Sequence, residues 1–130
     1  MAKEKQIDVL DALLNVSDEP EASVFMDRFG VNFRIKALGI KTIKRLQEQA
    51  TFPVGKKEVL DEEYFMALTI AEACVVPNWN DPALVKKYGT NDVAEIIRKR
   101  LLAGEQTKLV GEIMAVSGFD ATGAVAKAKN

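Results

Sequence analysis

A run of three acidic residues, Asp61, Glu62 and Glu63, forms a candidate acid–base or cation-binding cluster. Paired carboxylates can exchange protons with a substrate, and carboxylate oxygens are ligands for hard cations. The three residues directly precede an apolar run, however, and acidic side chains stabilise the first turn of a helix through its macrodipole. No calcium-loop spacing surrounds them. We therefore expect Asp61 to cap a helix, and we predict no metal site.

The sequence contains no histidine, which is the commonest general base and the usual partner of a catalytic serine or cysteine. Its serines therefore have no imidazole to activate them, and Cys74, the single cysteine, lies in an apolar run where a structural thiol is expected. The glycines never form the phosphate-binding patterns GxGxxG or GxxxxGK[ST]. We predict that the protein is not an enzyme and has no catalytic residue and no cofactor.

Composition and charge are typical of one soluble domain, with 48% hydrophobic and 28% charged residues in a chain of 130 residues. The formal net charge of -1 provides no overall field that would attract nucleic acid or an anionic membrane. No apolar run approaches the roughly 20 residues that span a bilayer, and the N-terminus lacks an apolar signal core. We expect a cytoplasmic protein that binds neither nucleic acid nor membrane.

The chain divides into four predicted parts. Residues 1–16 are predicted to form an amphipathic helix, residues 17–22 a linker with a proline and several polar residues, and residues 23–119 a single domain. Residues 120–130 are small and polar, which predicts a flexible C-terminal tail. The apolar residues of the first helix recur at helical spacing: Ile7, Leu10, Leu13 and Leu14.

The domain is predicted to begin with a β-hairpin. Val31, Phe33 and Ile35 alternate with polar residues, which indicates a half-buried strand, and strand-forming residues 24–26 precede it. Gly30 can adopt the positive φ that a tight turn requires. Because an isolated hairpin is only marginally stable, its apolar face must pack on helices.

The rest of the domain is predicted to be helical, apart from an exposed loop at residues 52–59. Apolar spacing, caps and breakers predict helices at residues 40–50, 62–76, 82–88, 93–102 and 105–117, with a break at Ala103 and Gly104. Asp81 is the predicted cap of the third of these helices, and Thr90, Asn91 or Asp92 that of the fourth. The predicted fold class is α+β and predominantly helical, with one N-terminal hairpin packed on a bundle of about five helices.

Protein-binding surfaces are the functional sites that the sequence favours. Trp79, the sole tryptophan, could anchor a partner or only fill the junction between two helices. The stripes of the first and last helices could hold a client protein, close the core, or form a homo-oligomer. The candidate binding residues are Ile7, Leu10, Leu13, Leu14, Trp79, Leu109, Ile113 and Met114.

A small helix-turn-helix DNA-binding regulator is the alternative function. Arg98, Lys99 and Arg100 precede the break at residues 103–104, and such cations could contact phosphates. The next helix begins with residues 105–108, EQTK, which offer few basic groups to a DNA groove. Solvated helix faces are therefore the favoured interpretation of these cations.

Between residues 23 and 120 the chain resembles the tail assembly chaperones of long-tailed phages and PBSX-like prophages, the XkdN-like family. The matching segments follow in order: FRIKAL at 33–38, DEEYFMAL at 61–68, EACVVPN at 72–78, DPAL at 81–84, KYG at 87–89, LLAGE at 101–105 and IMAVSGF at 113–119. Ala103, where the family often has proline, and the aromatic Trp79 depart from the family pattern.

The resemblance implies a non-enzymatic function in virion morphogenesis. A chaperone of this family would bind the tape measure protein, keep it soluble, and help recruit subunits of the major tail tube protein. It would act in the cytoplasm of the bacterial host and be absent from the mature virion.

Overall fold

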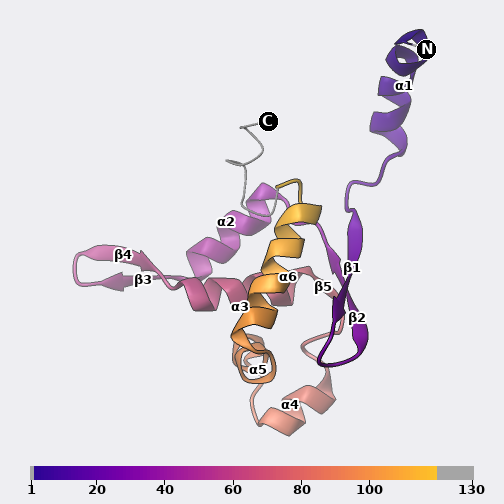
Figure 1. Cartoon of the computed structure of the whole chain (residues 1–130). Helices are drawn as coiled ribbons and strands as arrows, with labels where there is room; N and C mark the ends of the chain where they lie inside the picture. The colour runs from indigo at the N-terminus through magenta and orange to yellow at the C-terminus, as the bar shows by residue number, and fades with distance from the viewer. Residues whose placement is uncertain (1, 120–130) are drawn as a thin grey trace.

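The protein is described here from a computed structural model that places residues 2–119, and the side chains of residues 8–119. The predicted tail at residues 120–130 lies outside this part of the chain. Within it, the fold is α+β and rich in helix, as predicted (Figure 1). The elements follow in the order α1 (Ala2–Asn15), β1 (Glu21–Met26), β2 (Val31–Lys36), α2 (Ile40–Gln49), β3 (Thr51–Val54), β4 (Lys57–Leu60), α3 (Glu62–Ala73), β5 (Cys74–Val76), α4 (Pro82–Tyr88), α5 (Val93–Arg100) and α6 (Ala103–Val116).

The predicted first hairpin is confirmed as the antiparallel pair β1–β2. Gly30 closes the turn with a φ of +68°, and its N–H donates to the Met26 carbonyl at 2.8 Å. The alternation of side chains buries Val24 and Met26 of β1 together with Phe33 and Ile35 of β2. β1 begins at Glu21, so the last two residues of the predicted linker belong to the strand.

The long helix predicted at residues 62–76 is three residues too long. α3 ends at Ala73, and Cys74–Val76 forms β5, which pairs with β2 to give the strand order β1-β2-β5. Val75 and Val76 are β-branched, and Val76 precedes Pro77, which disfavours helical backbone at that residue. The exposed edge of β2 supplies the partner that completes this strand.

The prediction of an exposed loop at residues 52–59 is also wrong. This segment forms a second antiparallel hairpin, β3–β4, with the two-residue turn Gly55-Lys56 and a φ of +66° at Gly55. Pro53 argues against a central strand, but β3 has β4 as its neighbour on one side only. Figure 1 shows this hairpin extending away from the helices.

α3 is the central helix of the body and packs against α2, α5 and α6 (Figure 1). α6 also covers the apolar face of β1 and β2, so sheet and helices share one core. The predicted caps of α3 and α4 are confirmed, because Asp61 and Asp81 accept hydrogen bonds from backbone N–H groups of the first turns. Of the three candidate caps at residues 90–92 for α5, Asp92 is the one that accepts such a bond.

The ends of α6 are fixed by local hydrogen bonds. Gly118, with a φ of +104°, follows the helix, and the Phe119 N–H donates to the Met114 carbonyl at 2.9 Å. This confirms the predicted termination at Gly118. The predicted break at Ala103 and Gly104 is misplaced, because both residues lie in the first turn of α6. The Glu105 carboxylate accepts from the Leu102 N–H at 2.8 Å and so starts the helix two residues earlier.

Candidate protein-binding site

α1 presents an apolar stripe that is exposed to solvent. The predicted N-terminal helix is confirmed, and Figure 1 shows it standing apart from the body of the protein. Leu10, Leu13 and Leu14 are 63%, 74% and 72% exposed. Val9 and Val16 are exposed beside them at helical spacing, and together these five residues are called the α1 stripe. The side chain of Ile7 lies outside the described residues.

The other predicted binding residues lie mainly in the core. Leu109 and Ile113 have no exposed surface, and Trp79 is 4% exposed. Met114 is half-buried beside them on α6. A partner cannot reach Leu109, Ile113 or Trp79 unless the domain opens, so the apolar side of α6 closes the core in this conformation. The α1 stripe is therefore the candidate surface that the structure leaves accessible.

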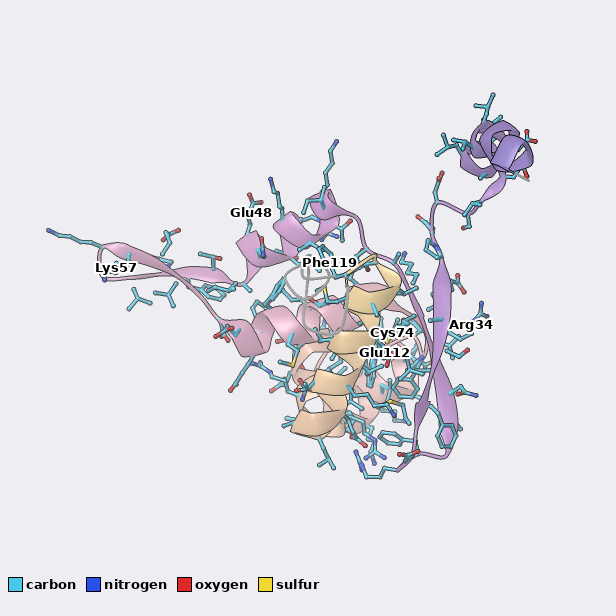
Figure 2. The ribbon with its side chains drawn as sticks, turned by 45° about the horizontal axis from the view of Figure 1, so that its top comes forward. Arg34, Glu48, Lys57, Cys74, Glu112 and Phe119 are labelled. Atoms are coloured by element: carbon cyan, nitrogen blue, oxygen red, sulfur yellow. The ribbon has the colours of Figure 1, made fainter. Side chains whose placement is uncertain are left out.

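Trp79 fills the junction between the sheet and the start of α4. Its ring meets Phe33 edge to face, with 6.1 Å between the ring centroids. The indole Nε1 is buried, and no acceptor in the described part of the chain meets the usual distance and angle limits for a hydrogen bond with it. The neighbouring Cys74, labelled in Figure 2, is half-buried, and this burial raises the pKa of its thiol to about 11. A structural role is the one this environment supports for both residues.

A second exposed apolar surface lies on the β3–β4 hairpin and was not predicted from the sequence. Phe52 pairs with Val59 across the hairpin, and Val54 pairs with Lys57, so these four side chains share one face. We call this set the hairpin face; all four of its residues are exposed. The alternation of Phe52 and Val54 was the available signal, but Pro53 and Gly55 within it favoured a loop.

An ion pair joins the β1–β2 turn to the start of α6. Arg28 donates from Nε and one terminal nitrogen to the two Glu105 carboxylate oxygens, at 2.9 and 2.7 Å. The same guanidinium donates to the Arg100 carbonyl at 3.0 Å and lies 4.5 Å from the centroid of the Phe29 ring. The hydrogen bond between Arg28 and Glu105 lowers the pKa of the Glu105 carboxyl group and raises the pKa of the Arg28 guanidinium.

We expect Glu105→Gln to make the free energy of unfolding less dependent on pH in the acid range. The folded chain holds the pKa of Glu105 below its ordinary value of 4.5, so the carboxylate stabilises the fold above that pH. This contribution is lost as the pH falls through the folded-state pKa. Urea unfolding at pH 7 and pH 3 should show a smaller difference for the variant than for the parent. Glu112→Gln, an exposed change on the same helix, is the control, and equal pH dependence in both variants would contradict the assignment.

The comparisons with known proteins identify the family. The family model described as "Phage XkdN-like tail assembly chaperone protein, TAC" matches residues 10–128. The chain belongs to this family of phage tail assembly chaperones. It is 28% identical over 109 residues to the uncharacterized protein YqbN of Bacillus subtilis strain 168, covering 78% of this chain and 73% of YqbN. The crystal structure of the protein YqbN superposes with a TM-score of 0.61 at 26% identity, covering 81% of this chain and 90% of that one.

Family membership favours the chaperone over the DNA-binding alternative, and the basic residues near α5 agree with it. Arg98 and Arg100 lie over the Tyr64 and Phe29 rings, 6.0 and 5.0 Å from the centroids. Lys108 donates to the Phe25 carbonyl at 2.6 Å. These three cations make contacts within the chain itself.

The described residues offer no group of three or more side chains that could hold a metal ion. Asp61, the first residue of the acidic run at residues 61–63, caps α3, since its carboxylate accepts from the Tyr64 N–H at 3.1 Å. None of the helices in residues 2–119 is long and apolar enough to cross a membrane. The chaperone family indicates a non-enzymatic role, and the surfaces described here are suited to binding other proteins.

Proposed function

We propose that the chain binds the phage tape measure protein during tail assembly, keeps it soluble and helps recruit tail tube subunits. The α1 stripe is the observation that carries the proposal, because it is a continuous apolar surface in a member of the tail assembly chaperone family. We place this activity in the cytoplasm of the bacterial host, with release of the chaperone before the virion is complete.

An exposed amphipathic helix is suited to a long helical client. Such a helix packs its apolar stripe against apolar stripes or grooves of the partner, with anchors at positions i, i+3, i+4 and i+7. Val9 and Leu13 of α1 have the i, i+4 spacing, and Val16, which directly follows the helix and donates from its N–H to the Ala12 carbonyl at 3.0 Å, has the i+7 position. α1 leaves the body through residues 16–20, so the helix can approach a client without disturbing the core.

The proposal is tested by co-expressing the chaperone with the tape measure protein. We expect the double substitution Leu10→Asp and Leu13→Asp to move the client from the soluble fraction to the pellet. Loss of two leucine contacts, at about 1.5 kcal/mol or more each, corresponds to a loss of affinity of at least about 100-fold. Client abundance in each fraction is measured by quantitative blotting.

The control places an aspartate on the other side of the same helix, with Asn15→Asp. This variant should keep the client soluble, because it leaves the α1 stripe intact. Both variants should have the thermal unfolding midpoint of the parent, since α1 stands apart from the body (Figure 1). Full client solubility with the stripe variant would refute the proposed binding surface.

A further inference from the structure

Two apolar surfaces of this chain are unpartnered in the described residues, the α1 stripe and the hairpin face. Both belong to elements that are weak alone. α1 has 14 residues, near the lower limit for an isolated helix in water, and β3–β4 is a two-stranded hairpin. Each element would gain stability by burying its apolar side against another surface.

The two surfaces match in size. From Val9 to Val16 the α1 stripe extends about 10 Å along the helix axis. Strand β3 extends about 10 Å from Thr51 to Val54. The apolar part of the hairpin face continues to Tyr64 at the start of α3, because the Phe52 and Tyr64 rings are 5.9 Å apart. About two turns of amphipathic helix are therefore long enough to cover the hairpin face.

The charges around the two surfaces are complementary. Residues 8–19 contain four acidic side chains and no basic one: Asp8, Asp11, Asp18 and Glu19. The hairpin carries Lys56 in its turn and Lys57 on the hairpin face itself, whereas Glu58 pairs with Pro53 on the opposite face; Figure 2 shows Lys57 at the outer end. Opposite charges of this kind favour encounter and orientation of the two elements.

Geometry favours pairing between two copies of the chain. Figure 1 shows α1 and the β3–β4 hairpin extending from opposite sides of the body. Residues 16–20 span at most about 17 Å, and the far end of this segment is fixed because the Pro20 carbonyl accepts from the Ala37 N–H at 2.9 Å. A helix tethered in this way meets the hairpin of a neighbouring copy without crossing its own body.

We propose that the α1 stripe of one copy docks on the hairpin face of a second copy. The contact joins two different surfaces, so it is heterologous and can be repeated or closed into a reciprocal pair. It uses the same stripe as the proposed client site, so the client and the second copy compete for α1. Self-association would then keep the stripe covered until a client displaces the hairpin.

Mixing two variants tests this contact. The stripe variant carries Leu10→Asp and Leu13→Asp, and the hairpin variant carries Val54→Glu and Val59→Glu. We expect the parent to exceed the 14.3 kDa monomer mass in size-exclusion chromatography with light scattering, and each variant alone to be monomeric. An equimolar mixture should form a dimer, because the intact helix of one variant meets the intact hairpin of the other.

Three results would overturn the proposal. The first is a monomeric parent, and the second is a mixture of the two variants that stays monomeric. The third is a hairpin variant that still self-associates, which would indicate that α1 pairs with α1. Circular dichroism and thermal unfolding establish that both variants are folded. The hairpin variant keeps the α1 stripe, so it should still solubilise the tape measure protein. Its failure to self-associate is thereby distinguished from failure of the proposed function.

A cysteine crosslink supplies a second readout. A chain with Leu13→Cys is mixed with a chain with Val54→Cys under mild oxidation, while the native Cys74 thiol stays protonated because of its raised pKa, about 11. We expect a disulfide-linked dimer to form at least about tenfold faster than with Asn15→Cys, which lies on the other side of α1. Equal rates from the two positions would contradict the docking of the stripe.

Discussion

Replacing Ile113 with alanine is expected to lower the free energy of unfolding by about 2–5 kcal/mol. Ile113 has no exposed surface and lies on α6, which packs against α3 and covers the sheet. Removing its side chain beyond Cβ leaves a cavity that surrounding residues fill only in part. Urea unfolding followed by circular dichroism measures the change.

Ile40→Ala is the matched control, because it removes the same atoms from a side chain that is 62% exposed. Its effect should remain within about 0.5 kcal/mol. Equal losses in the two variants would mean that α6 does not pack as described. The same burial makes polar replacements of Ile113 unsuitable for locating a client site, since they would destabilise the body itself.

Replacing Trp79 with alanine is expected to cost about 3–5 kcal/mol, because the ring is 4% exposed and packs on Phe33. Trp79→Phe should cost no more than about half as much, since it keeps an aromatic ring and removes an Nε1–H that has no hydrogen-bond partner of ordinary geometry in the described residues. Chemical unfolding of both variants gives the comparison. If Trp79→Phe lowered the free energy of unfolding as much as Trp79→Ala does, the indole N–H would have to make a stabilising interaction.

Much of the fold could be predicted because its signals are local. Asp61, Asp81 and Asp92 cap their helices through hydrogen bonds that span two or three residues. Gly30 and Gly118 adopt the positive φ that their turns require. The alternation of apolar and polar residues in β2 predicted both the strand and its buried face, because successive side chains of a strand point to opposite faces.

The missed strands depend on pairing that periodicity does not reveal. Cys74–Val76 continues an apolar run begun in α3 and becomes strand only because the edge of β2 lies beside it. β3 contains Pro53 and ends at Gly55, both of which are signals of loops. In each case the partner strand, and not the propensity of the segment, decides the structure.

The candidate site could be predicted only in part. The apolar residues of α1 and of α6 both recur at helical spacing, and sequence alone did not decide which of the two sets is buried in the core. Leu109 is buried because α6 has the sheet and α3 as neighbours, whereas Leu13 is exposed because α1 stands apart from the body (Figure 1). The hairpin face was missed together with its strands.

The first hairpin and the residues just after it are joined to α6 and its C-cap by contacts between residues far apart in the chain. Arg28 binds Glu105, the Phe25 carbonyl accepts from Lys108, and the Leu38 N–H donates to Ser117, across separations of 77, 83 and 79 residues. A ribosome completes α1 and the hairpin well before it adds α6, so the apolar face of the sheet stays uncovered during most of translation. α1 needs none of these late residues. The nascent chain can therefore offer its first helix to a partner while the rest of the polypeptide is still being synthesised.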